Sequence, residues 1–290
     1  MGYLPLSDHA ARQLIDSITL FNESRRVQRQ ARQYAGGMYW KRQGAYEYLV
    51  KTQPDNRQSR IGPRSPETEK VLEEFTTRKR NMEARYKTLR DALTDAERLN
   101  KALRVGRVPA LVVSVLQALE DAELGAHFTV VGTHALYAYE TAAGVRIVPG
   151  ALATQDVDLL WDARRRVRFM TDMQQLDTSV LKVLQRADAT FVRKEGQNET
   201  AINARGFEVD FLRRQPEGDD PRFEHMVVAA TGRMTLMRTI APESFVAFKR
   251  WMASTVTTRP EPKRQRDILQ AGIVQRLLDE GLLMAVQGNL

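Results

Sequence analysis

Three aspartates are the residues of this chain best suited to catalysis. Asp156 and Asp158 stand two residues apart in a segment that reads as a strand, and Asp210 follows at the end of a later apolar run. Side chains two apart on a strand project from the same face. Carboxylates held that close repel each other unless a hard divalent cation neutralises them. The pattern therefore predicts a Mg²⁺ site, with two ions, that suits moving a nucleotide from a triphosphate.

Gly132 and Thr133 precede the aspartates at an expected strand-to-helix turn. Because glycine has no side chain, the backbone can approach a ligand closely, and the N-terminus of the next helix offers free N–H groups to phosphate. The Thr133 hydroxyl can add one more donor. Each feature also has an ordinary interpretation, since Gly-Thr begins many structural helices and a surface Asp-x-Asp can pair with Arg164 and Arg166.

The elements that must position these residues fall into three predicted regions. Residues 1–108 form a basic accessory region, residues 109–240 a small mixed α/β palm, and residues 241–290 a helical region. Helical spacing predicts helices at 7–33, 66–103, 111–122, 135–142 and 168–184. Short aromatic, apolar and β-branched runs predict a meander within 38–62 and strands at 127–131, 156–161, 190–192, 200–203 and 206–212. The predicted fold class is α+β with a mixed sheet.

Composition excludes several classes of site. The 290 residues include no cysteine, which excludes disulfides, thiolate metal sites and thiol nucleophiles. The four histidines show no ligand spacing for zinc, and His134 is expected to be a packed or capping residue rather than a base. No apolar run approaches the ~20 residues that a membrane span requires. We therefore expect a cytoplasmic protein with no membrane partner.

Positive charge is concentrated in the first quarter of the chain. The net charge is +8, and residues 1–64 hold eleven Lys/Arg against five Asp/Glu. Such a segment suits a polyanionic partner, although a merely solvated basic surface is an equal alternative. The aromatic and basic residues that could stack bases and bind phosphates are Tyr39, Trp40, Lys41, Arg42, Tyr46, Tyr48 and Arg60. The alternative is that the aromatics form the packing core of a small sheet.

Residues 125–270 resemble the nucleotidyltransferase-fold superfamily, the group of polymerase β-like and antibiotic nucleotidyltransferases. More closely they resemble its bacterial nucleotidyltransferase-like branch and the toxins of AbiE-type toxin–antitoxin systems. Five motifs carry the resemblance: Val131-Gly-Thr-His-Ala-Leu136, Thr154-Gln-Asp-Val-Asp-Leu-Leu160, Gly206-Phe-Glu-Val-Asp210, Pro242-Glu-Ser-Phe-Val-Ala-Phe-Lys249 and Lys263-Arg-Gln-Arg-Asp267. The match covers half of the chain, and Thr133 replaces the Ser or Gly usual in the family. The meander at 38–62 has no counterpart in those toxins.

The resemblance implies roles for several residues. Asp156 and Asp158 would hold Mg²⁺ and bridge the NTP phosphates, and Asp210 would share a metal and help to deprotonate an acceptor hydroxyl. Lys249, Arg264 and Arg266, with Lys263 as a further cation, could bind the triphosphate, although charged helix faces are usually just solvated. Asp267 is expected to be a salt-bridge partner within its own helix.

The expected function is transfer of a nucleoside monophosphate from an NTP to a hydroxyl on a macromolecule, with RNA and especially tRNA favoured. A toxin role with an antitoxin protein as partner is part of what the resemblance implies. Two alternatives stay open: transfer to a small molecule or protein side chain, and an inactive nucleic-acid-binding module. The presence of all three carboxylates favours an active site, because nothing structural requires them together.

Overall fold

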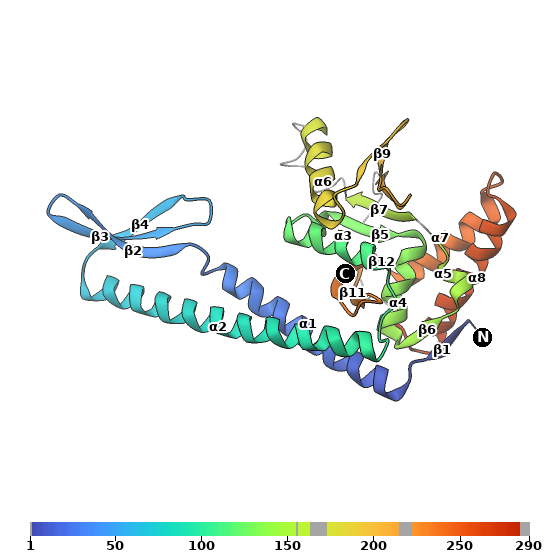
Figure 1. Cartoon of the computed structure of the whole chain (residues 1–290), viewed down its shortest axis with the longest axis horizontal. Coiled ribbons are helices and arrows are strands. Elements are labelled where there is room, and N and C mark those ends of the chain that lie inside the picture. The colour runs from blue at the N-terminus through green and yellow to red at the C-terminus, as the bar shows by residue number, and fades with distance from the viewer. Residues whose placement is uncertain (1, 155, 163–172, 215–221, 285–290) are drawn as a thin grey trace. The chain divides into compact units, whose positions relative to one another are not determined.

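The computed structural model describes residues 2–154, 156–162, 173–214 and 222–284 (Figure 1). The chain divides into two compact units: Met1–Leu14 with Glu97–Leu290, and Ile15–Ala96. Arg164 and Arg166, and the first part of the helix predicted at 168–184, lie outside the described residues.

The smaller unit is built on two long helices and a three-stranded antiparallel sheet. Its helices belong to α1 (Asp8–Arg32) and α2 (Pro66–Ala102), and its strands are β2 (Gly37–Gln43), β3 (Tyr46–Thr52) and β4 (Gln58–Pro63). The Ser65 hydroxyl accepts a hydrogen bond from the Thr68 N–H at 3.3 Å, and Pro66 follows it at the first helical position. The predicted helices and meander are confirmed.

The larger unit contains a seven-stranded mixed sheet in the order β11-β12-β5-β7-β10-β9-β8. Two neighbouring pairs, β7–β10 and β5–β12, are parallel, and the other pairs are antiparallel. The strand bounds are β5 (Phe128–Val131), β7 (Asp156–Asp162), β8 (Val192–Lys194), β9 (Gln197–Ile202), β10 (Glu208–Arg214), β11 (Arg222–Val228) and β12 (Met234–Ile240). The predicted α+β class with a mixed sheet is confirmed.

Strands β11 and β12 were not predicted from the sequence. They form a hairpin whose turn contains Gly232 with a φ of 90°. β12 is nearly continuously buried but is rich in Met and Leu, including Met234, Leu236 and Met237. These residues have weak strand preferences, so tertiary burial rather than local propensity makes this segment a strand.

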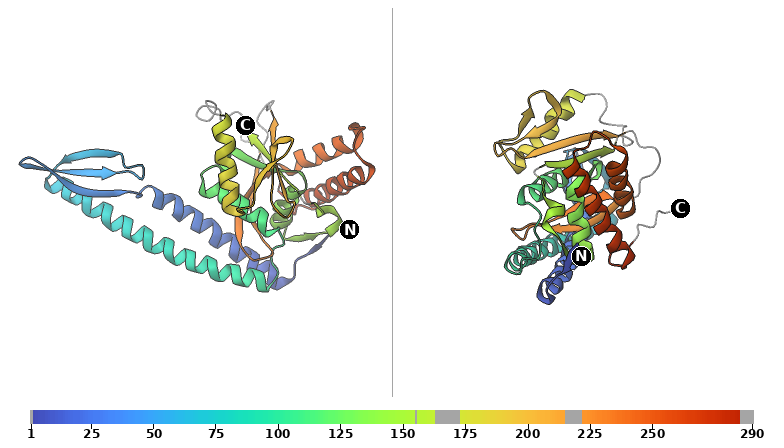
Figure 2. Two further views of the ribbon diagram at one scale, coloured as in Figure 1. Left: turned by 45° about the horizontal axis from the view of Figure 1, so that its top comes forward. Right: turned by 90° about the vertical axis from the view of Figure 1, so that its right-hand side faces the viewer.

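Helices cover the sheet and enclose one hydrophobic core. The helices are α3 (Ala110–Asp121), α4 (Ala135–Ala143), α5 (Pro149–Leu152), α6 (Met173–Ala187), α7 (Pro242–Thr255) and α8 (Glu261–Asp279), and a small second sheet pairs β1 (Tyr3–Pro5) with β6 (Val145–Ile147). Both α3 and α4 pack on β12, while α7 and α8 pack side by side (Figure 2). Leu136, Leu159 and Val209 are fully buried between these layers. No helix among the described residues combines the length and apolar character needed to cross a membrane.

Candidate active site

Strand register brings the three predicted aspartates together. β7 and β10 are parallel with Asp158 directly opposite Asp210, and Asp156 precedes Asp158 by two residues. Side chains in these positions share one face of the sheet. One carboxylate oxygen from each aspartate lies within 4.8 Å of one from each of the others, and all three residues are half-buried. Clustered carboxylate oxygens are the ligands that Mg²⁺ prefers, so this donor set fits a hard divalent cation.

The electrostatics of the cluster favour a cation. Burial, followed by the charges of Asp156 and Asp210, raises the pKa of Asp158 to about 6. The positive charges of Lys249 and Lys263 oppose this increase in the pKa. The carboxylate of Asp158 therefore carries a repulsive cost that a bound metal ion would remove.

Neighbouring threonines orient two of the carboxylates. The hydroxyl of Thr200, which lies opposite Asp210 on β9, donates a hydrogen bond to Asp210 Oδ1 at 2.6 Å. The Thr154 hydroxyl donates to Asp156 Oδ1. Neither threonine was a predicted site residue, although Thr154 stands only two residues before Asp156. These hydrogen bonds restrict the side-chain rotamers of the two aspartates.

The predicted turn at Gly132 and Thr133 lies beside Asp158. Val131, the last residue of β5, is opposite Asp158, and a short 3₁₀ turn (Gly132–His134) leads into α4. Gly132 has a φ of 68°, and a Cβ there would lie 2.3 Å from Asp158 Oδ2. Glycine is therefore required for two reasons, backbone conformation and close approach of the carboxylate.

His134 is buried behind this turn. Its ring packs against the rings of Tyr137 and Phe207. Burial lowers the pKa of His134 to about 4, against the opposing charge and backbone hydrogen bond of Asp156. Its burial and ring contacts agree with the expectation that His134 is a packed residue.

The cations of α7 and α8 are held in different ways. Lys249 is buried and its Nζ donates to Asp267 Oδ1 at 2.8 Å, while Arg259 binds the other oxygen of Asp267. Asp267 was expected to pair within its own helix. The structure corrects this, because the packing of α7 on α8 brings Lys249 to Asp267 and the chain before α8 supplies Arg259. Burial lowers the pKa of Lys249.

Three further predicted cations lie near the start of α8. Arg266 donates to the main-chain oxygen of Ala153 at 2.6 Å, which ties the helix to the segment just before Asp156. Arg264 pairs with Glu261 at 3.8 Å, and Lys263 is exposed. Among the described residues, the Nε atoms of Arg264 and Arg266 are buried without a hydrogen-bond partner.

Comparison with known proteins decides the family. A family model described as Nucleotidyltransferase matches residues 110–222 and 219–287, which is more than half of the chain. The chain belongs to the nucleotidyltransferase family. It is accordingly a nucleotidyltransferase enzyme, and the family implies an NTP as substrate. No curated protein and no solved structure matches the chain.

A third polar residue of the candidate site, besides Thr154 and Thr200, was not predicted from the sequence. Gln270 on α8 is fully buried, and its Nε2 donates to Thr133 Oγ1 at 3.2 Å and to the Ala151 main-chain oxygen at 2.6 Å. It thereby joins the Gly132–Thr133 turn to the segment that leads to Asp156. A glutamine in a charged helix gives no sequence signal of this role, because the contact depends on how α8 packs.

The small sheet of this nucleotidyltransferase separates its aromatic residues onto two faces. Pairing of Trp40 with Leu49 and of Arg42 with Glu47 puts these four on the face where Leu49 is fully buried. Lys51 of that face lies over the Phe75 ring of α2. The packing interpretation therefore holds for this face.

The other face of the sheet is the more exposed one at its aromatic residues, although Val50 on this face is buried. It carries Tyr39, Lys41, Tyr46, Tyr48 and Arg60, as the alternation of side chains and the strand register require. Tyr46 is 66% exposed and its ring lies 6.4 Å from that of Tyr48, which the Arg60 guanidinium covers at 3.0 Å. Five of the seven predicted nucleic-acid residues thus share one face.

Proposed function

We propose that the nucleotidyltransferase moves a nucleoside monophosphate from an NTP to a hydroxyl of RNA, with tRNA the first candidate, at a two-metal Mg²⁺ site in a polymerase β-like palm. One observation carries the proposal: the register of β7 and β10 gathers Asp156, Asp158 and Asp210 within 4.8 Å beside the Gly132 turn. Mg²⁺ ions bound there would supply charge neutralisation for the attacking and leaving oxygens.

The three carboxylates take separate roles in this proposal. Asp156 and Asp158 would hold the metal ion that neutralises the NTP phosphates, and Asp158 is ionised at neutral pH because its pKa is about 6. Asp210 would share a metal ion and receive the proton of the acceptor hydroxyl, whose oxygen bonds to the α-phosphorus of the NTP as pyrophosphate leaves. The hydrogen bond from Thr200 keeps the Asp210 carboxylate directed into the site.

The turn and the helical cations complete the triphosphate site. Main-chain N–H groups of the turn at Gly132 and the Thr133 hydroxyl are the proposed phosphate donors. Lys249 is engaged by Asp267, so its proposed contribution is a positive charge near Asp158 rather than a free ammonium group. Exposed Lys263 is better placed to move onto a phosphate, and Arg264 and Arg266 are weaker candidates.

The more exposed face of the small sheet supports RNA as the acceptor. The neighbouring, mutually tilted rings of Tyr46 and Tyr48 offer π-faces for bases, and Lys41 and Arg60 offer cations for phosphates. Growth inhibition by such RNA modification, with an antitoxin protein as partner, is the biological form suggested by the resemblance to AbiE-type toxins.

Label transfer tests the proposal and its alternatives together. The protein is incubated with each α-labelled NTP, Mg²⁺, and total RNA, total protein or a small-molecule acceptor set. We expect label in RNA and a loss of at least about 10³-fold in the Asp156→Ala/Asp158→Ala variant, as for removal of a catalytic group. Asp91→Ala, a change of an exposed aspartate on α2, is the matched control.

Each other outcome is informative. If label appears only in protein or only in small molecules, that class of molecule is the acceptor and RNA is not. Label that survives the double substitution would contradict the assigned site. Absence of label from every fraction, with RNA still bound, would favour an inactive binding module.

A further inference from the structure

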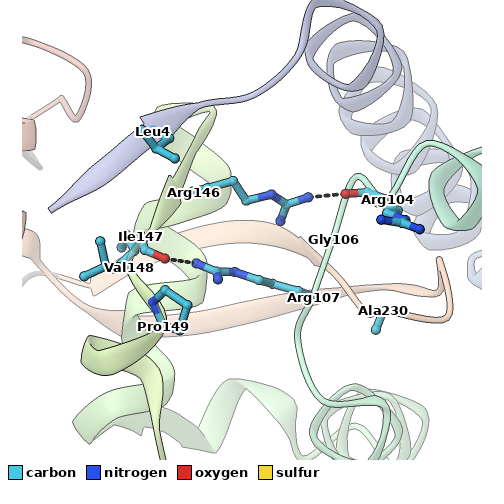
Figure 3. Close-up of a pocket in the computed structure, with 9 residues that line it drawn as sticks. All are labelled: Leu4, Arg104, Gly106, Arg107, Arg146, Ile147, Val148, Pro149 and Ala230. Atoms are coloured by element: carbon cyan, nitrogen blue, oxygen red, sulfur yellow. Dashed lines mark hydrogen bonds between the residues drawn. The ribbon is translucent and has the colours of Figure 1, made fainter. Parts of the chain in front are cut away.

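A cavity of about 450 Å³ lies in the larger unit, apart from the predicted catalytic residues (Figure 3). Four chain segments line it: β1, the linker after α2, the segment from β6 into α5, and the turn between β11 and β12. Its size is that of a small-molecule site. The lining residues used below are Leu4, Arg104, Arg107, Arg146, Pro149 and Ala230.

Positive charge exceeds negative charge around this cavity. None of the described residues that line it is acidic, and the carboxylate of buried Glu140 pairs with two of its three arginines, Arg107 and Arg146. Glu140 accepts hydrogen bonds from Arg107 Nε at 2.9 Å, from the Ile147 N–H at 2.8 Å and from Arg146 at 3.5 Å. Two guanidinium groups, those of Arg107 and Arg146, therefore share the Glu140 carboxylate, and Arg104 adds a third positive charge, so an anion is the complementary ligand.

Two of the arginines are already fixed in place. Arg107 also donates to the Ile147 main-chain oxygen, and Arg146 donates to the main-chain oxygens of Arg104 and Val105. Figure 3 shows the Arg107 side chain reaching toward β6 and the Arg146 side chain reaching toward the linker. Because both side chains are held before a ligand arrives, binding costs little additional rotamer entropy.

The third arginine is exposed at the rim of the cavity. The Arg104 side chain makes no hydrogen bond or ion pair with another described residue. Its backbone has a φ of 51°, a conformation that residues other than glycine adopt uncommonly. Arg104 is therefore available to close over an anion. The rest of the wall is apolar and includes Leu4, Pro149 and Ala230.

We propose that this cavity binds a small anion that carries a compact apolar group, of the class of aryl phosphates and aryl carboxylates. The guanidinium groups bind the anionic end, and the apolar wall contacts the ring. The site is independent of the proposed catalytic function, since none of its residues belongs to the aspartate cluster.

The cavity is nevertheless joined to that cluster by a short stretch of chain. Pro149 begins α5, and the Ala151 main-chain oxygen is held by Gln270, which also binds Thr133. Asp156 follows a few residues later. A ligand in the cavity would therefore rest against the segment that positions Asp156.

Isothermal titration of the full chain with phenyl phosphate, without divalent cations, tests the proposal. We expect phenyl phosphate to bind at least about tenfold more tightly than phenol or inorganic phosphate, because it alone satisfies both the arginines and the apolar wall. Arg104→Gln is expected to weaken binding about fivefold, and Ala230→Phe, which fills the cavity, to abolish it. Arg205→Gln is the control, since Arg205 is 85% exposed on the same unit.

Several results would overturn the proposal. If phenol binds as tightly as phenyl phosphate, the arginines do not recognise the anion. If inorganic phosphate binds as tightly, the apolar wall does not recognise the ring. Unchanged binding in both Arg104→Gln and Ala230→Phe, or no heat at millimolar phenyl phosphate, would also reject the site. Tighter phenyl phosphate binding in Asp156→Asn/Asp158→Asn would assign the anion to the catalytic cluster instead, because the substitution removes negative charge that repels an anion there.

Discussion

At the scale of single residues, the aspartate cluster is assembled by backbone register against its own electrostatic repulsion. Asp158 pairs with Asp210 across parallel strands, and burial and the two neighbouring carboxylates raise its pKa to about 6. Such a cluster reduces the stability of the metal-free protein, and a bound cation would remove that cost. This conflict between stability and function is typical of active sites.

Replacing Asp158 with Asn should stabilise the metal-free protein in a pH-dependent way. The folded-state pKa of Asp158 lies above its unfolded value. The ionised Asp158 carboxylate therefore destabilises the folded protein fully above pH 6 and hardly at all below pH 4, where it is protonated. We expect Asp158→Asn to raise the free energy of unfolding by roughly 2–3 kcal/mol at pH 7.5 and by clearly less at pH 4.5. Denaturant unfolding at both values checks this, with Asp91→Asn as control. An equal gain at both values would contradict the assigned electrostatics.

Gly132→Ala should disturb the cluster directly. The added Cβ would lie 2.3 Å from Asp158 Oδ2 at a φ of 68°, whereas Gly144 has a φ of 64° with nothing within 4 Å of its added Cβ. Both alanine variants incur the backbone cost of about 1 kcal/mol, but only Gly132→Ala adds a clash. We expect Gly132→Ala to lose nucleotidyl transfer and more stability than Gly144→Ala. Thermal unfolding and label transfer measure both effects, and equal behaviour of the two variants would refute the close approach.

The sequence predicted the three clustered aspartates, but it did not predict the residues that hydrogen-bond to the candidate site and hold it in place. Period-two spacing was enough to place Asp156 and Asp158 on one face, because strand geometry is local. Thr200 and Gln270 reach the site through strand pairing and helix packing that join residues far apart in the chain. Such long-range contacts cannot be predicted from the local periodicity of the sequence.

At the scale of elements, the small sheet shows how one strand pattern can serve two purposes. The packing interpretation agrees with one face, where Trp40 and Leu49 face α2, while nucleic-acid contact stays a prediction for Tyr46 and Tyr48 on the more exposed face. The alternation of side chains assigns each residue to one of the two faces, but only the strand register shows which residues of neighbouring strands share a face. Strands β11 and β12 were missed because neither shows period-two alternation: β12 is a nearly continuous buried run rich in Met and Leu, and β11 ends in the buried run 226–228.

Substitutions on the two faces of this sheet should have different effects. We expect Tyr46→Ala to weaken binding of a single-stranded RNA by about tenfold, through lost stacking, while leaving thermal stability unchanged. Trp40→Ala, on the packed face, should lower the free energy of unfolding by about 1–3 kcal/mol and leave RNA affinity intact where the protein is folded. Fluorescence anisotropy and thermal unfolding separate the two. Equal loss of RNA affinity in both variants would contradict the assignment of the faces.

At the scale of the whole molecule, charge is divided unequally between the two compact units. Residues 15–96 hold seventeen Lys/Arg against eleven Asp/Glu, so this unit carries most of the net charge of +8. The larger unit contains the carboxylate cluster and is nearly neutral. A polyanion should therefore be attracted mainly to the smaller unit.

RNA binding should accordingly depend on salt through the smaller unit. We expect the affinity to fall as salt rises from 50 to 200 mM, and Lys41→Gln to reduce the slope of log K against log salt by about 0.7. Arg205→Gln, in the larger unit, should leave the slope unchanged. Anisotropy titrations at several salt concentrations provide the slopes. A larger effect of Arg205→Gln than of Lys41→Gln would place the RNA site elsewhere.

Metal stoichiometry tests the central claim most directly, namely that Asp156, Asp158 and Asp210 together hold two divalent cations. Mn²⁺ binding, measured by electron paramagnetic resonance with a non-hydrolysable NTP present, should give two ions per chain in the unsubstituted protein. Asp158→Asn should lose this binding almost completely, and Asp91→Asn should retain it. Undiminished Mn²⁺ binding in the Asp158→Asn variant would contradict the account.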